Sequence, residues 1–122
     1  MSLSEEIASA IGAHGAWKLR LRTAVNTGRS ELSCEQVGKD DQCPFGKWLY
    51  GPGISSEMKT SEHYRTCRTL HAEFHRCASK VLKLAVAGEK QQAETELSPA
   101  GAFTAVSNRL MSAMTAWKTA AR

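Results

Sequence analysis

The sequence feature that most constrains the fold is a long seam of apolar residues in the second half of the chain. From about residue 57 to 87, such positions recur at alternating intervals of three and four: Tyr64, Cys67, His71, Phe74, Ala78, Val81 and Ala85. This spacing places the side chains on one side of an α-helix. A helix can bury such a stripe only against other helices, so the seam predicts a helical bundle.

Two further stretches have the same kind of periodicity. The first is expected to run from about residue 4 to 26, with Ser4 as its cap and Thr27-Gly28 as its stop. Its stripe consists of Ile7, Ile11, His14, Leu21 and Val25. The last helix is expected to restart at Ser98-Pro99, with Ser98 as its cap and Pro99 at its first position. It carries Phe103, Val106, Leu110, Met114 and Trp117 on one face.

Shorter segments connect these three helices. Residues 29–41 are rich in helix breakers and are expected to form a long loop. The loop leads into Cys43-Pro44-Phe45-Gly46-Lys47-Trp48-Leu49-Tyr50-Gly51, which has the spacing of a short helix with Pro44 in its first turn. A short polar helix is expected over residues 89–97.

Length and composition agree with one compact α-helical domain. The chain has 122 residues, of which 42% are hydrophobic and 23% charged, which are ordinary values for a globular domain. No stretch alternates like a strand with hairpin turns. We therefore expect a single all-α domain over residues 1–122, an antiparallel bundle of about four helices plus the short cysteine-bearing segment.

Charge and hydropathy narrow the expected partners. No run of about 18 apolar residues predicts a membrane helix, and the polar N-terminus has no secretory signal. We therefore expect a cytoplasmic protein with reduced thiols. The net charge is only +4. The basic residues of the long helix are interpreted as a solvated face rather than a contact for nucleic acid or membrane; they are Arg65, Arg68, Arg76, Lys80 and Lys83.

Three histidines fall where core residues are expected. His14 lies in the stripe of the first helix, His71 in the seam, and His75 one turn after His71 on the same side. Burying several imidazoles is costly unless each has a partner, and one metal ion would satisfy all three. Cys43, at the end of the loop, is the candidate fourth ligand. One thiolate and three imidazoles suit tetrahedral Zn²⁺.

The remaining cysteines and the fourth histidine have simpler interpretations. Cys67 could reach the same face as His71, but is better explained as a small hydrophobic residue of the seam. Cys34 and Cys77 are interpreted as unligated thiols, and His63 as a surface residue. The order His14, Cys43, His71, His75 matches no zinc-finger spacing.

Three motifs resemble the chemoreceptor zinc-binding (CZB) domain family. They are Ala13-His14-Gly15-Ala16-Trp17, the segment from Cys43 to Tyr50, and His71-Ala72-Glu73-Phe74-His75. The resemblance covers nearly the whole chain, although the last third matches only in helical character. It implies a cytoplasmic regulatory zinc sensor with a helical-bundle fold, often dimeric. It also implies zinc ligation by His14, Cys43, His71 and His75.

The resemblance further implies a function in bacterial signalling. Family members are usually attached to chemoreceptors or diguanylate cyclases, which indicates control of chemotaxis or of cyclic-di-GMP, and no such segment is present in this sequence. In some members, hypochlorous acid attacks the zinc-bound cysteine. The leading hypothesis is thus a non-enzymatic zinc sensor, with Cys43 as a redox switch. The alternatives are a zinc hydrolase, which needs an open metal position, and a di-iron bundle, which needs carboxylates on core faces.

Overall fold

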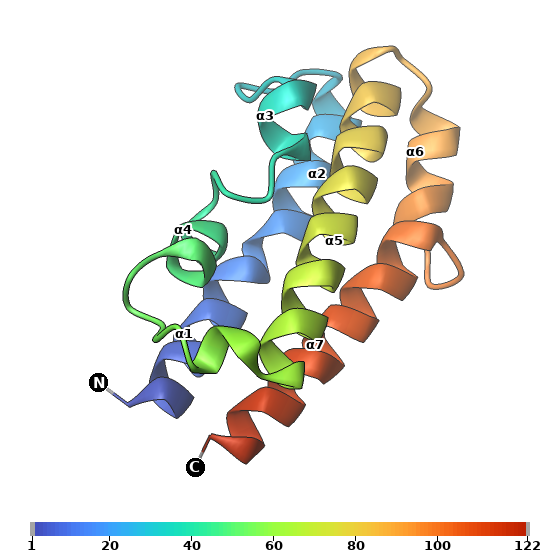
Figure 1. Ribbon diagram of the computed structural model, residues 1–122. Helices are drawn as coiled ribbons and strands as arrows, with labels where there is room; N and C mark the ends of the chain where they lie inside the picture. The colour runs from blue at the N-terminus through green and yellow to red at the C-terminus, as the bar shows by residue number, and fades with distance from the viewer. Residues whose placement is uncertain (1, 122) are drawn as a thin grey trace.

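A computed structural model describes residues 2–121 and has an all-α fold, as predicted (Figure 1). In chain order, the elements are α1 (Leu3–His14), α2 (Ala16–Thr27), α3 (Cys34–Gly38), α4 (Pro44–Tyr50), the 3-10 helix η1 (Met58–Thr60), α5 (Glu62–Val86), α6 (Lys90–Leu97) and α7 (Ala102–Ala120). No strand occurs within the described residues.

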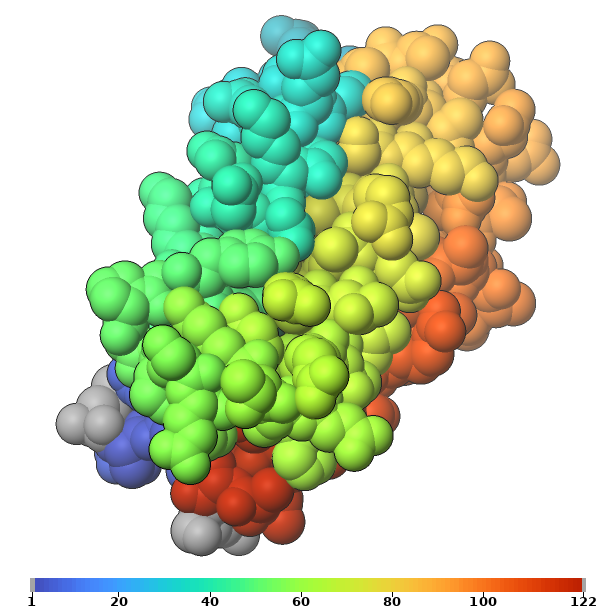
Figure 2. Space-filling model, in the orientation of Figure 1, coloured from blue at the N-terminus to red at the C-terminus, as the bar shows by residue number. Residues whose placement is uncertain are grey.

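The long helices form a bundle in which some neighbouring helices are parallel and others antiparallel (Figure 1). Helices α1 and α2 run in the same direction as α5, because residues 29–61 lead the chain back before α5 begins. Helices α6 and α7 then run antiparallel to α5. They also run antiparallel to α1 and α2, against which they pack, so the antiparallel helical bundle predicted from the sequence is confirmed. The returning segment lies beside α5 and, on the face seen in Figure 2, covers much of α1 and α2.

The first predicted helix is divided at one residue. Gly15, between α1 and α2, keeps right-handed helical dihedral angles (φ −60°, ψ −22°), so the two helices are nearly continuous. The N-terminal cap is Ser2, which accepts a hydrogen bond from the Glu5 amide; the expected cap, Ser4, lies within α1. Gly28 ends α2 with a left-handed backbone (φ 71°), as predicted.

The expected loop over residues 29–41 contains a helix that the sequence interpretation missed. Ser33 accepts a hydrogen bond from the Gln36 amide, and the Gln36 side chain bonds back to the Ser33 amide, which forms a capping box for α3. Val37 of this helix is buried. The cap and this one apolar residue suffice because α3 packs against α5.

The last helix begins later than predicted. Ser98 and Pro99 lie in a turn, in which the Ser98 hydroxyl donates to the Thr95 carbonyl and the Gly101 amide donates to Ser98. Helix α7 starts only at Ala102, with Gly101 as its cap. A side chain at position 101 would overlap the carbonyl oxygen of Glu96, so the end of α6 packs directly on this turn.

The predicted core positions are buried. All seven residues of the seam on α5 and all five of the stripe on α7 have at most 6% of their surface exposed. In the first stripe Ile11 is only partly buried, and the other four residues are in the core. The five basic residues of α5 are exposed, as expected for a solvated face. No helix within residues 2–121 combines the length and apolarity needed to cross a membrane.

Candidate metal centre

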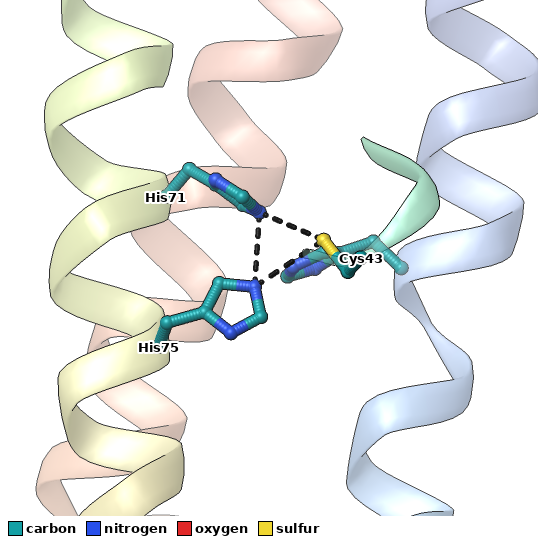
Figure 3. Close-up of side chains that lie close together, drawn as sticks. Cys43, His71 and His75 are labelled. Carbon is teal, nitrogen blue, oxygen red and sulfur yellow. Dashed lines mark hydrogen bonds between the residues drawn. The ribbon is translucent and has the colours of Figure 1, made fainter. Parts of the chain in front are cut away.

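Four buried side chains converge from three separate parts of the chain. His14 is the last residue of α1, Cys43 directly precedes α4, and His71 and His75 face inward from α5 (Figure 3). One potential ligand atom from each lies within 4.8 Å of all the others. Their exposed fractions range from 0% to 6%. The structure therefore brings together the four residues that the sequence singled out as candidate ligands.

The three distances among Cys43, His71 and His75 are close to those of a tetrahedral zinc site. Cys43 Sγ lies 3.4 Å from His71 Nε2 and 3.4 Å from His75 Nε2, and the two Nε2 atoms are 3.0 Å apart (Figure 3). Zinc–ligand bonds of ~2.0–2.1 Å to nitrogen and ~2.3 Å to sulfur at tetrahedral angles would separate the ligand atoms by about 3.3–3.6 Å. Small adjustments of the side chains would therefore accommodate the ion.

A backbone carbonyl fixes the proton position on His75. The Nδ1 atom of His75 lies 2.8 Å from the Val37 carbonyl oxygen, which can only accept a hydrogen bond. Nδ1 therefore carries the proton in the neutral ring, and Nε2 presents its lone pair to the cluster. Such a carbonyl partner is typical of metal-binding histidines, because it sets both the tautomer and the ring orientation.

Aromatic rings surround the imidazoles and limit their movement. The Phe74 ring packs 4.2 Å from the His14 ring, and the Phe45 ring 4.5 Å from the His71 ring, measured between centroids. The Trp17 ring meets His75 edge-on at 5.3 Å. These contacts orient the rings.

Burial keeps the cluster uncharged in the absence of a metal. Desolvation, followed by the neighbouring histidines, lowers the pKa of His14 to about 3 and of His71 to about 2. Burial also lowers the pKa of His75, although the Val37 carbonyl and the Asp40 carboxylate oppose this shift. The pKa of the Cys43 thiol is raised, chiefly by burial. At neutral pH the imidazoles are thus already deprotonated, as ligands must be, and only Cys43 has a proton to release.

Two imidazole nitrogens have no hydrogen-bonding partner within the described residues. They are Nε2 of His14 and Nδ1 of His71, and both are completely buried. An unpartnered buried polar atom costs about 1–3 kcal/mol. Coordination through His14 Nε2 would remove one of these penalties, so the donor set and its unsatisfied nitrogen fit a bound cation.

Short-range contacts hold Cys43 in place. Its Sγ caps α4 by accepting a hydrogen bond from the Gly46 amide at 3.3 Å. A Cβ at Gly46 would overlap the Asp40 carbonyl oxygen, so the segment before Cys43 packs directly on α4. At the other end of α4, the Tyr64 hydroxyl donates to the Leu49 carbonyl at 2.9 Å. Helix α4 is therefore fastened to α5 at one end and to the cluster at the other.

The residues that were not singled out as ligands lie outside the cluster. Cys67 is completely buried in the core, and His63 is exposed. Cys34 and Cys77 are half-buried free thiols. Glu73, between the two histidines of α5, lies 3.8 Å from the Arg109 guanidinium. Throughout residues 2–121, no carboxylate belongs to a cluster of three or more potential metal ligands.

Sequence reasoning missed two contributors to the site. The Val37 carbonyl lies on α3, in a region interpreted as a loop, and a backbone oxygen leaves no trace in residue type. Asp40, whose carboxylate accepts a hydrogen bond from the Tyr50 hydroxyl, lies within the expected loop over residues 29–41 and was assigned no role. The Ser33-x-x-Gln36 capping pattern was the one local signal that could have indicated α3.

Comparison with known families identifies the chain. The sequence model described as "Chemoreceptor zinc-binding domain" matches residues 14–82, which is more than half of the chain and includes the whole cluster. The chain belongs to the chemoreceptor zinc-binding domain family. Its cofactor is accordingly zinc, and the family is one of regulatory sensor domains. Comparisons with curated proteins and with solved structures gave no match.

Proposed function

We propose that this chemoreceptor zinc-binding domain is a zinc sensor in which His14, Cys43, His71 and His75 are the metal ligands. The observation that carries the proposal is the convergence of their four ligand atoms, all buried and within 4.8 Å of one another. The distances among Cys43, His71 and His75 are close to those of a tetrahedral site, which supports the assignment.

The donor set favours regulation over catalysis. A catalytic zinc keeps one position open for water or substrate, whereas four protein ligands fill a tetrahedral site. Glu73, between His71 and His75 in sequence, faces Arg109 instead of the cluster, and the Asp40 carboxylate accepts a hydrogen bond from Tyr50. We therefore infer a non-enzymatic role for the domain. We also infer that residues 1–122 form a single domain.

Cys43 couples zinc binding to the position of the segment that covers the bundle. The three histidines belong to helices of the bundle, but Cys43 belongs to the segment that covers it. Ligation of Sγ would tie this segment to α1 and α5, and loss of the metal would release it. Oxidation of Cys43 has the same consequence: hypochlorous acid transfers its oxygen to the thiolate sulfur to form a sulfenic acid, and chlorine leaves as chloride.

Membership of the family supports an output in bacterial signalling. We infer a cytoplasmic domain that acts as a homodimer on an attached or associated signalling partner of the chemoreceptor or diguanylate cyclase type. Its output would then be chemotaxis or the cyclic-di-GMP level. In either case, the change in packing of residues 39–51 on the bundle is the signal that the partner must detect.

Metal analysis of purified variants tests the ligand assignment. The wild-type domain should contain one zinc per chain, and Cys43→Ala and His71→Ala should lose most of it after dialysis against a weak chelator. The matched controls are His63→Ala, an exposed histidine on the same helix, and Cys77→Ser, which should both keep full occupancy. Zinc-free wild-type protein, or full occupancy in His71→Ala, would disprove the proposal.

A further inference from the structure

The buried cluster is reached by a small cleft between α2, α3 and residues 39–44. The cleft has a volume of about 200 Å³, and its lining includes the buried residues Cys43 and His75. A neighbouring cavity between α1 and α4, of about 240 Å³, is lined by Pro44 and Phe45 but by none of the four cluster residues. The first cleft is therefore the path that leads to the cysteine.

The lining of this cleft is positively charged. Two exposed cationic residues, Arg20 from α2 and Lys39 from the segment after α3, contribute to it together with Gln36 and Gln42, and no carboxylate does. Asp40 is close enough to influence the pKa values of His75 and Cys43, but its carboxylate accepts a hydrogen bond from Tyr50 and does not line the cleft.

One aromatic side chain holds a cation close to the cluster. The Arg20 guanidinium lies 5.1 Å from the centroid of the Trp17 ring, in a cation–π contact. The same ring packs edge-on against His75 at 5.3 Å. Trp17 thus positions the Arg20 charge beside the passage that reaches Cys43.

We propose that this cleft admits small thiol-reactive molecules to Cys43 and that Arg20 and Lys39 select those with negative charge, in particular anionic disulfides. The inference deepens the proposed sensor function, on which its physiological meaning rests. In the reaction, the Cys43 thiol releases its proton to solvent, and the resulting thiolate attacks one sulfur of the disulfide. The disulfide bond breaks, a mixed disulfide forms on Cys43, and the other half leaves as a thiolate. Fixed cations near the passage raise the local concentration of anionic reactants.

The test compares two disulfide reagents on the full chain as purified. The probes are the dianion dithiobis(nitrobenzoate) and the neutral dithiodipyridine, and mass spectrometry follows modification of Cys43. Cys34→Ser and Cys77→Ser form the background, because these two thiols are half-buried and would also react. The measured quantity is the ratio of the two rates, in which any change in the ionised fraction of Cys43 cancels.

The decisive variant is Arg20→Gln/Lys39→Gln, and its matched control is Arg22→Gln/Lys47→Gln. Both pairs remove two exposed positive charges, and Arg22 lies on the same helix as Arg20. The ratio of the dianion's rate to the neutral reagent's rate should fall about five-fold in Arg20→Gln/Lys39→Gln and stay within about 1.5-fold of wild type in the control. In the wild type, the same ratio should decrease as salt is raised to about 0.5 M.

An unchanged ratio in Arg20→Gln/Lys39→Gln, or an equal decrease in the control, overturns the inference. Circular dichroism establishes that both variants keep their helices, and Arg20→Lys should retain most of the preference because it retains the charge. Zinc content is measured on the same samples. A chain without zinc would refute the proposed function without changing the rate ratio, so the two failures are distinguishable.

Discussion

The histidines and the cysteine of the cluster are held in two different ways. His14, His71 and His75 project from helices whose apolar faces pack into the core, and their rings are enclosed by other aromatic rings. Cys43 belongs to a short segment outside the long helices. Its buried residues Phe45 and Leu49 anchor it in the core, and it is further held by the hydrogen bond from Tyr64 to Leu49.

This difference teaches how a bundle can respond to a ligand. The histidine half of the cluster is preorganised, because its positions follow from burial of the helix stripes. The cysteine half must dock onto it. Loss of bundle packing should therefore reduce stability with little effect on the site. Loss of docking should weaken the site with little effect on the bundle. The following predictions test that separation, in order of decreasing effect.

A cavity in the bundle should lower stability without weakening zinc binding. Leu82 is 2% exposed and follows His75 on α5 by seven residues, which is about 10 Å along the helix. Leu82→Ala should reduce the free energy of unfolding of the metal-free domain by about 2–5 kcal/mol. Because effects at this separation are usually independent, zinc affinity of the folded domain should change by less than about threefold.

Urea denaturation with a chelator and competition titration with a zinc indicator provide the two measurements. A large decrease in zinc affinity for Leu82→Ala would show that the bundle and the site are not separable.

Acidification should destabilise the metal-free domain through its buried histidines. The ordinary pKa of 6.5 applies to the unfolded chain, whereas folding lowers the pKa of His14 to about 3 and of His71 to about 2. Between pH 6.5 and pH 5 the unfolded chain therefore takes up protons that the folded, metal-free domain does not. Stability is present above pH 6.5 and is lost as the pH falls, by roughly 3 kcal/mol at pH 5 for these two residues.

Chemical denaturation of the metal-free domain at a series of pH values measures this slope. His63→Ala is the matched substitution at an exposed histidine of α5. Constant stability from pH 6.5 to pH 5 would contradict the buried neutral state of the imidazoles.

Blocking the docking of the Cys43 segment should weaken zinc binding. Gly46→Ala places a Cβ against the Asp40 carbonyl oxygen, which forces residues 39–43 away from α4. We expect zinc affinity to fall about tenfold, equivalent to ~1.4 kcal/mol, while the helical content stays near that of wild type. The matched control is Gly53→Ala, where a Cβ would meet no atom within 4 Å.

Competition titration against a zinc indicator separates the two glycine variants. Equal zinc affinity for Gly46→Ala and wild type would mean that the docked segment contributes nothing to the site.

Local sequence patterns predicted much of the fold. The alternating spacing on α5 identified all seven of its seam residues as buried, and Gly28 correctly marked the end of α2. Helix α3 was missed because five residues with one buried side chain show no periodicity, and its stability comes from packing on α5. The start of α7 was misplaced because Ser98-Pro99 has the pattern of a helix start, whereas packing of Gly101 on Glu96 made it a turn.

The sequence likewise predicted some features of the candidate site and not others. Histidines at buried positions of amphipathic helices were visible from spacing, since helical periodicity determines which side of each helix faces inward. The tautomer of His75 was not visible, because it depends on the Val37 carbonyl, 38 residues away in sequence. The cleft with Arg20 and Lys39 was not visible either, because its walls come from α2 and from the segment after α3.

The sequence by itself determined which residues are buried and which chemistry they offer: three imidazoles and a thiol with the donor properties that zinc prefers. Only the tertiary structure decided that their ligand atoms lie within 4.8 Å of one another, that α1 and α2 run in the same direction as α5, and that a cationic cleft leads to Cys43. The physical reason is that periodicity depends on the geometry of one helix. Distances between elements depend instead on how their side chains pack across the core.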